Sequence, residues 1–198
     1  MALTIVSQRC CFVVVAATLM LGSSAAAAAA TVVDLATNVN NKALVDYICK
    51  QAESYDFCFS ILSRDVRTPS ADIHGLSLLS IALSIDQVSD TIDQKIDHPT
   101  FSHAAADHVD KDRMDACKSD YEKALTMFLR AYDACSRRSY WEVIDLVKYG
   151  ANKAIDCENI YRRHDPMRVS PISGDNHKLI RLAEITLIVI DTLLRSTP

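Results

Sequence analysis

Glycine and proline, the residues that most often form turns, are scarce in this sequence. Its 198 residues contain four glycines and five prolines. An all-β domain needs a turn signal between each pair of short strands, so these numbers argue against a sandwich or a barrel. The prolines instead separate long segments, which favours helices.

The sequence also lacks the short motifs that mark common active sites. It contains no nucleophile elbow (G-x-S-x-G), no zinc-protease motif (H-E-x-x-H) and no phosphate-binding loop. We therefore predict a protein that is not an enzyme, with no catalytic residue and no cofactor. A formal net charge of −4 is a poor match for nucleic acid, so we expect no nucleic-acid partner.

One stretch, "HPTFSHAAADHVDKD", gathers histidines and acids and is the best candidate for a metal site. His98, His103 and His108 recur at steps of five, which places successive imidazoles on different faces of a helix. A polar connector between two helices explains the same residues, which also include Asp107, Asp110 and Asp112. We predict a connector and no metal.

The first thirty residues have the order of a secretory signal peptide. Arg9 precedes a twelve-residue run, Cys10–Leu21, that is apolar except for Thr18, and six alanines follow a Gly-Ser-Ser break. A membrane anchor is the alternative, but a spanning helix needs about 20 strongly apolar residues. We predict a signal peptide over residues 1–30, cut between about 25 and 30, and one domain over 31–198. No later apolar run reaches spanning length, so no membrane association is expected after cleavage.

Four long segments have apolar residues at helical steps of three and four. They are 70–97, with Ser70 as its cap, and 109–136, 140–162 and 176–195. Two shorter helical patterns lie within 32–66. We predict an all-α fold, an antiparallel four-helix bundle preceded by a helical hairpin. In the second long helix the apolar stripe includes Phe128 and Tyr132, which we expect to fill the core.

Five cysteines remain after the signal peptide, and secretion makes disulfides their expected state. Cys117 and Cys157 each lie twenty residues from Arg137 in the turn between the two middle helices, so they sit at the same height of an antiparallel pair and can bond. Cys135 is on the helix of Cys117, about 27 Å away at 1.5 Å per residue, and cannot reach it. Cys135 is then a free, buried thiol, which burial makes inert.

Cys49 and Cys58 remain, and they pair locally. Ser54, Tyr55 and Asp56 form the expected turn between two short helices, and a disulfide across that turn ties the helices together. Loop-closure entropy predicts a stabilisation of about 2.7 kcal/mol for this short loop and about 4 kcal/mol for the Cys117–Cys157 loop.

The turn between the middle helices holds the best candidate for a protein interface. Arg137 and Arg138 precede Tyr140 and Trp141, the only tryptophan. Interface hot spots favour arginine and aromatic side chains. The alternative is that one ring caps the core of the helix pair while the arginines are solvated.

The motifs "ICKQAESYDFCFSILSRD", "ACKSDYEKAL", "DCENIY" and "SPISGDNHKLIRLAEITLIVIDTL" resemble those of the plant invertase and pectin methylesterase inhibitors. The likeness covers roughly residues 40–195 and is greatest to a pollen-allergen-like subgroup of invertase inhibitors. The resemblance implies a secreted protein of the apoplast, or of the vacuole, that binds and blocks a cell-wall carbohydrate-active enzyme. Its partner is that enzyme.

The resemblance leaves the target enzyme open. Some invertase inhibitors of this family insert a Pro-Lys-Phe motif near the middle turn, where this sequence reads "SRRSYWEVID". The missing motif favours pectin methylesterase as the target, with acid invertase as the alternative. A third hypothesis, from another class, is a bundle that carries a small apolar ligand. An enclosed cavity of a few hundred Å³ would distinguish that carrier.

Overall fold

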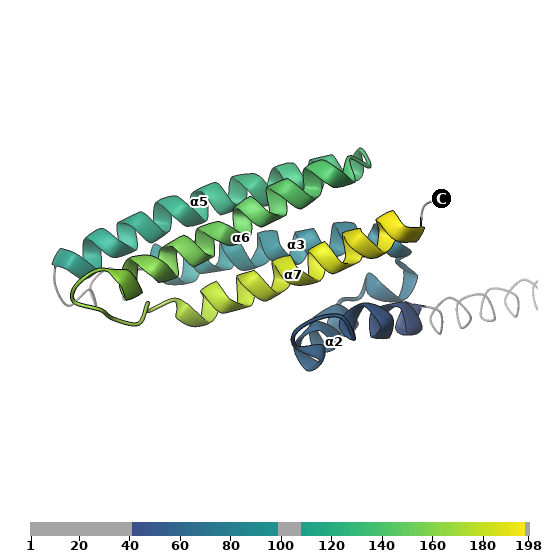
Figure 1. Cartoon of the computed structure of the whole chain (residues 1–198), viewed down its shortest axis with the longest axis horizontal. Coiled ribbons are helices and arrows are strands. Elements are labelled where there is room, and N and C mark those ends of the chain that lie inside the picture. The colour runs from purple at the N-terminus through teal and green to yellow at the C-terminus, as the bar shows by residue number, and fades with distance from the viewer. Residues whose placement is uncertain (1–40, 99–107, 197–198) are drawn as a thin grey trace, which may run out of the picture.

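The computed structural model describes residues 41–98 and 108–196, and all its regular elements are helical. The bundle helices form an elongated body, with the N-terminal hairpin against one side (Figure 1). Residues 41–49 form the first helix of the hairpin. The other elements are α2 (Tyr55–Arg64), η1 (Thr68–Ser70), α3 (Ile73–Thr91), η2 (Ile92–Ile96), α5 (His108–Ser136), α6 (Tyr140–Arg163) and α7 (Ser173–Ser196).

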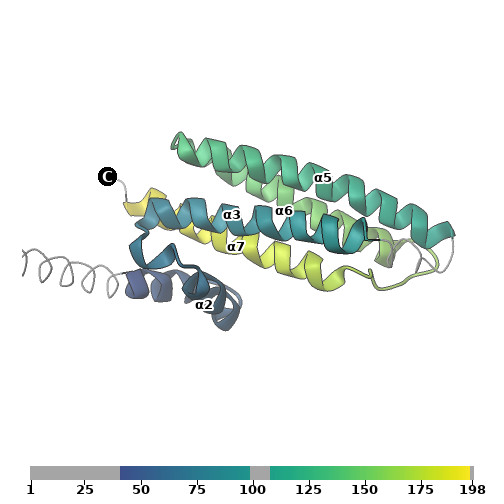
Figure 2. The same cartoon turned by 180° about the vertical axis from the view of Figure 1, so that it is seen from behind.

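The four long helices α3, α5, α6 and α7 make an up-down-up-down bundle. Helix α5 packs on α6, α6 on α7, α7 on α3, and α3 on α5. The same neighbours lie side by side from the front and from behind (Figures 1 and 2). The predicted fold class, an antiparallel four-helix bundle with an N-terminal hairpin and two disulfides, is confirmed.

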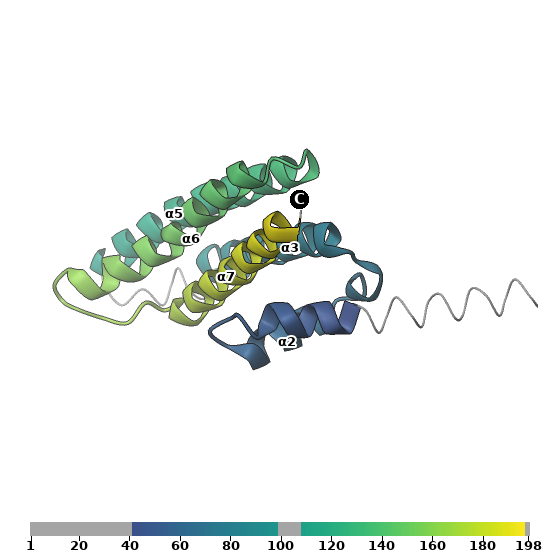
Figure 3. The ribbon, with the colours of Figure 1, turned by 45° about the vertical axis from the view of Figure 1, so that its right-hand side comes forward.

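The N-terminal hairpin packs on the side of the bundle that α3 and α7 form. Seen from the side, it lies beneath these two helices and away from α5 and α6 (Figure 3). Its apolar residues join α3 and α7 residues in a separate core cluster: Val45, Ile48, Cys49, Cys58, Leu62, Leu76, Leu79, Ile185 and Val189. The hairpin is therefore held to the bundle by apolar burial.

Helix α3 differs from the sequence prediction at both ends. Ser70 lies in the short η1 helix, and the cap is Asp72, whose Oδ1 accepts a hydrogen bond of 2.7 Å from Gly75 N. An aspartate and a serine are equally good caps, so residue type alone could not decide between them. At the other end, the π-helical turn η2 replaces the expected α-helix, and Ile96 remains buried.

The buried stripe of α5 uses smaller residues than predicted. Tyr132 is 40% exposed, so the expectation that it fills the core is wrong. The positions that face the other helices are instead held by Phe128 and by three alanines: Ala124, Ala131 and Ala134. Small residues let α5 approach α6 closely, and the Phe128 ring lies against Gly150 of α6.

Large side chains fill the bundle interior. Tyr121, Phe128 and Tyr161 are all fully buried in one continuous core cluster. A carrier would need empty space at these positions, so the packing argues against the ligand-carrier hypothesis. Across residues 41–98 and 108–196, no helix is both long and apolar enough to cross a lipid bilayer.

Candidate protein-docking surface

The turn between α5 and α6 closes α5 with a Schellman motif. Ser139 N donates to Ala134 O and Arg138 N donates to Cys135 O, both at 2.9 Å. Arg138 takes the left-handed position of this motif, with φ 62°. Glycine is the usual residue there, because a side chain at positive φ costs about 1–2 kcal/mol. The chain thus keeps an arginine where glycine would be more stable.

The strained arginine lies beside Tyr140. Arg138 Nη1 donates to the Tyr140 hydroxyl at 3.5 Å, a long contact. The same hydroxyl lies 3.2 Å from Nδ1 of His74, whose ring packs edge-on against the Tyr140 ring. Tyr140 also contacts the bundle core. It therefore links the turn to the start of α3 and fixes the geometry of the bundle end.

Trp141 points in the other direction. It is 74% exposed, one of the largest exposed fractions among the apolar side chains described. The two rings therefore divide the roles that the sequence left open, with Tyr140 on the core and Trp141 toward solvent. Arg137, the first residue after α5, forms ion pairs with Asp133 at 3.0 Å and with Glu142 at 3.6 Å. Exposed pairs contribute little stability, so these side chains can exchange partners at an interface.

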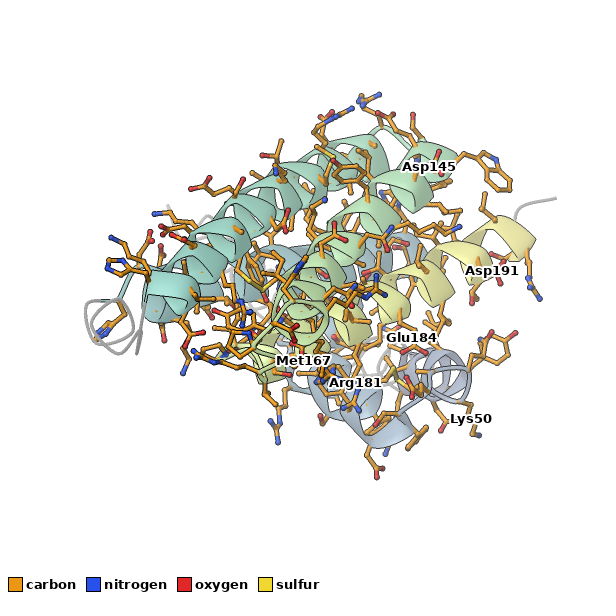
Figure 4. All side chains as sticks on the ribbon, turned by 60° about the vertical axis from the view of Figure 1, so that its left-hand side comes forward. Lys50, Asp145, Met167, Arg181, Glu184 and Asp191 are labelled. Carbon is orange, nitrogen blue, oxygen red and sulfur yellow. A yellow bond between two sulfur atoms is a disulfide. The ribbon has the colours of Figure 1, made fainter. Side chains whose placement is uncertain are left out.

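A groove that the sequence did not indicate runs between α6, α7 and the hairpin. It has a volume of about 580 Å³. Lys148 and Asn152 border it from α6, and its apolar floor comes mainly from α7: Ile180, Ala183, Leu187 and Ile188. Glu184 and Asp191 of α7 lie on this face, with Asp145 of α6 and Lys50 of the hairpin (Figure 4). Sequence periodicity could not find it, because its floor residues have the spacing of core residues.

The structure pairs Cys49 with Cys58 and Cys117 with Cys157. The Cys117–Cys157 bond joins α5 to α6 in the half of the bundle far from the α5–α6 turn. Cys135 is a buried thiol next to that turn. Burial raises the pKa of the Cys135 thiol to about 11, against a smaller opposing effect of Arg138, so at neutral pH it is protonated and unreactive.

Polar residues meet inside the bundle next to the Cys117–Cys157 bond. Asn176 of α7 is fully buried, accepts from the Tyr121 hydroxyl at 2.9 Å and donates to Glu158 Oε2 at 2.9 Å. Glu158 Oε1 also accepts from Arg162 and Ser173, at 2.8 and 3.0 Å. The buried polar groups are paired with one another, which is the arrangement of a structural network.

The histidine- and acid-rich stretch is only partly described. His103 and Asp107 lie outside the described residues. His108, Asp110 and Asp112 begin α5, and Asp110 pairs with Arg168. Among the residues that the structure describes, no group of three or more metal-ligating side chains gathers. The described residues thus give no positive support to a metal site.

The described residues form a helical bundle with an exposed turn and an open groove on its surface. Over residues 43–189 the chain matches the family described as Plant invertase/pectin methylesterase inhibitor. The chain belongs to this family, whose members are inhibitors of enzymes and not enzymes themselves. Function therefore lies in binding a target enzyme.

Two curated relatives and one solved structure illustrate the likeness. The chain is 30% identical to Pectinesterase inhibitor 5 of Arabidopsis thaliana, over 75% of this chain and 82% of that protein. It is 24% identical to Cell wall / vacuolar inhibitor of fructosidase 2 of the same plant, over 65% and 71%. A crystal structure of a pectin methylesterase inhibitor from Arabidopsis thaliana shares the fold, with TM-score 0.54 at 16% identity, over 76% of this chain and 96% of that chain.

Proposed function

We propose that this chain inhibits a plant pectin methylesterase by forming a protein–protein complex with it. A relative at 30% identity is named as a pectinesterase inhibitor. The absence of a Pro-Lys-Phe motif near the α5–α6 turn supports the same target. Inhibition of an acid invertase is the second candidate, because a relative at 24% identity is named as an inhibitor of fructosidase.

The observation that carries this proposal is that an exposed Trp141 and a strained Arg138 lie three residues apart at one turn. A side chain 74% exposed buries a large apolar area when a partner covers it. The neighbouring Arg138 is held at a positive φ that costs stability, and such strain concentrates at functional sites. Trp141, Arg137 and Arg138 then form the docking surface, and Tyr140 holds the turn in place.

Rigidity is the second requirement of an inhibitor of this kind. The Cys117–Cys157 bond and the paired polar residues fix α5 and α6 as one unit. A surface that is already ordered loses little conformational entropy on binding. The turn thus meets the enzyme in the conformation that it has in the free protein.

Residues 1–30 direct the chain to the secretory pathway in this proposal, with cleavage between about 25 and 30, and residues 31–198 form the inhibitor. The inhibitor then acts in the apoplast or in the vacuole. A relative whose name includes both cell wall and vacuole is consistent with either place.

An inhibition assay with the refolded chain tests the proposal. Titration against a pectin methylesterase and an acid invertase, at mildly acidic pH and with both disulfides confirmed, should show inhibition of the first enzyme. Trp141→Ala should raise the inhibition constant about tenfold or more, as truncation of an aromatic hot spot does. Tyr47→Ala, an exposed aromatic of the hairpin, is the matched control. A parent chain that inhibits neither enzyme would refute the proposal.

A further inference from the structure

The connection between α6 and α7 exposes apolar side chains at the other end of the bundle. Met167 is 73% exposed and Val169 is 72% exposed. Exposure alternates along the segment, because Arg168 is half-buried, Ser170 is buried, Pro171 is exposed and Ile172 is buried. Met167, Val169 and Pro171, which we term the loop strip, are therefore the residues within 167–172 that face solvent.

A buried arginine of the bundle holds the backbone of this segment through hydrogen bonds. Arg113 of α5 is buried, and its guanidinium donates to His164 O and to Pro166 O, each at 2.9 Å. The same guanidinium lies 5.5 Å from the centre of the Tyr161 ring. One arginine thus holds two carbonyls of the loop in a fixed geometry.

Arg168 anchors the middle of the segment. Its backbone N donates to Tyr161 O at 2.9 Å, and its side chain pairs with Asp110 of α5. The residues on either side of this anchor are Met167 and Val169. Two large apolar side chains are therefore presented on a backbone that is bonded to the bundle at three points.

A solvent-facing loop has no structural need of these side chains. Single exposed apolar residues are common, but Met167 and Val169 lie two positions apart on an ordered backbone, and exposed apolar residues that lie close together are typical of partner-binding surfaces. Figure 4 shows Met167 on the near side of the bundle end, on the loop that joins α6 to α7. Arg163, four residues earlier, is exposed and makes no ion pair with other described residues.

We propose that the loop strip is a second contact surface for the target enzyme, and that it fits an apolar depression bordered by a carboxylate. This inference rests on the proposed function. Helix α6 has 24 residues, which spans about 36 Å at 1.5 Å per residue. The strip and Trp141 lie at opposite ends of that helix, so both can contact only a target that extends along the bundle. Arg113 is the positioning residue of the strip.

Affinity measurements on exposed-residue variants test the inference. Met167→Ser combined with Val169→Ser should weaken binding to the inhibited enzyme about tenfold or more. Neither side chain is buried, so the fold should be unchanged. Val66→Ser, which alters an apolar residue that is 91% exposed elsewhere, is the matched control and should bind like the parent. Arg163→Glu should weaken binding further.

A double-mutant cycle tests the role of Arg113. Arg113→Met should weaken binding in the parent chain and have no further effect once Met167 and Val169 are both serine, because it acts through them. If Arg113→Met does not fold, the serine variants alone decide. An equal loss of affinity from Arg113→Met in both backgrounds would mean that Arg113 does not act through the strip.

The outcomes separate this inference from the proposed function. Full affinity of the serine double variant, with affinity lost in Trp141→Ala, would overturn the loop strip and leave the inhibitor proposal standing. Inhibition of neither enzyme by the parent would overturn both. A third outcome concerns self-association. If the parent sediments as a dimer, the serine double variant sediments as a monomer and inhibition is unchanged, the strip serves self-association, and the inference is overturned.

Discussion

The hydroxyl of Tyr121 on α5 lies 2.9 Å from Oδ1 of Asn176 on α7, and both side chains are fully buried. The amide nitrogen of Asn176 donates in turn to Glu158 on α6. One asparagine therefore satisfies buried groups from two other helices. Such a network fixes the relative positions of three helices more specifically than apolar contact does.

Replacing Asn176 by alanine should lower the free energy of unfolding by roughly 3 kcal/mol, because it removes the hydrogen bonds of Asn176 to the buried Tyr121 hydroxyl and to one oxygen of Glu158. Urea unfolding followed by circular dichroism measures the change. Asn152→Ala, at an exposed position of α6, is the control and should change stability by less than about 0.5 kcal/mol. Equal effects of the two changes would contradict the network.

Stability should fall at acidic pH in a way that depends on Glu158. Burial raises the pKa of its carboxyl, but hydrogen bonds from Asn176, Arg162 and Ser173 outweigh burial and hold the pKa below the ordinary value of 4.5. When the folded pKa is depressed, stability is present above pH 4.5 and is lost as the pH falls through the folded pKa.

The pH effect is measured by unfolding the chain in urea between pH 3 and 7. Glu158→Gln should flatten the acidic limb of the stability curve, because a glutamine does not titrate. Glu122→Gln, on the exposed side of α5, should leave the limb as steep as in the parent. A limb of the same slope in Glu158→Gln would assign the acid sensitivity to other carboxyls.

Arg138→Gly should stabilise the protein by about 1 kcal/mol, because glycine adopts the left-handed position of a Schellman motif without strain. It should also weaken inhibition, since it removes the arginine from the docking surface. Arg137→Gly is the contrast: Arg137 does not have a positive φ, so glycine there should lower stability. Thermal unfolding and the inhibition assay together check both, and a loss of stability in Arg138→Gly would show that the turn does not strain its arginine.

Two glycines should respond to alanine with opposite signs. A Cβ at Gly150 would lie 2.8 Å from Cε2 of Phe128, so Gly150→Ala should lower the free energy of unfolding by roughly 1–3 kcal/mol. A Cβ at Gly174 meets nothing within 4 Å, so Gly174→Ala should raise it by roughly 0.5 kcal/mol. Combining Gly150→Ala with Phe128→Leu should recover part of the loss. A gain of stability in Gly150→Ala would mean that α5 and α6 are less closely packed at this position than the 2.8 Å contact requires.

Removing a cysteine should matter far more at Cys117 than at Cys135. Cys117→Ser opens the Cys117–Cys157 bond and should cost about 4 kcal/mol through loop entropy. Cys135→Ala removes one buried sulfur and should cost about 1 kcal/mol. Differential scanning calorimetry compares the two variants with the parent. Equal shifts in Tm would refute the assigned pairing.

The sequence predicted features that depend on helical period and on equal distances along two helices. The pairing of Cys117 with Cys157 is an example, because both residues lie twenty positions from Arg137 in the turn between their helices. The sequence could not show that Ala131 is buried and its neighbour Tyr132 is 40% exposed, since both residues are apolar and adjacent on the helix. Nor could the sequence predict that Asn176 lies beside Glu158, because the spacing of polar residues does not show which of them are buried.

The surfaces that bear on function were predicted only in part. Arg137, Arg138, Tyr140 and Trp141 are contiguous in sequence, so residue type alone indicated them. The loop strip was missed because its order comes from Arg113, which is more than fifty residues away in the chain and reaches it only in the folded protein.

Both disulfides close within their own unit, one inside the hairpin and one between α5 and α6. The hairpin is therefore joined to the bundle by a single covalent path, the connector from residue 65 to residue 72. The other links between the two are noncovalent, and they include the apolar contacts of the hairpin and a 2.8 Å hydrogen bond from Glu53 N to Glu184. A protease that cut this connector would leave two separately cross-linked fragments, which denaturant could part without any reductant.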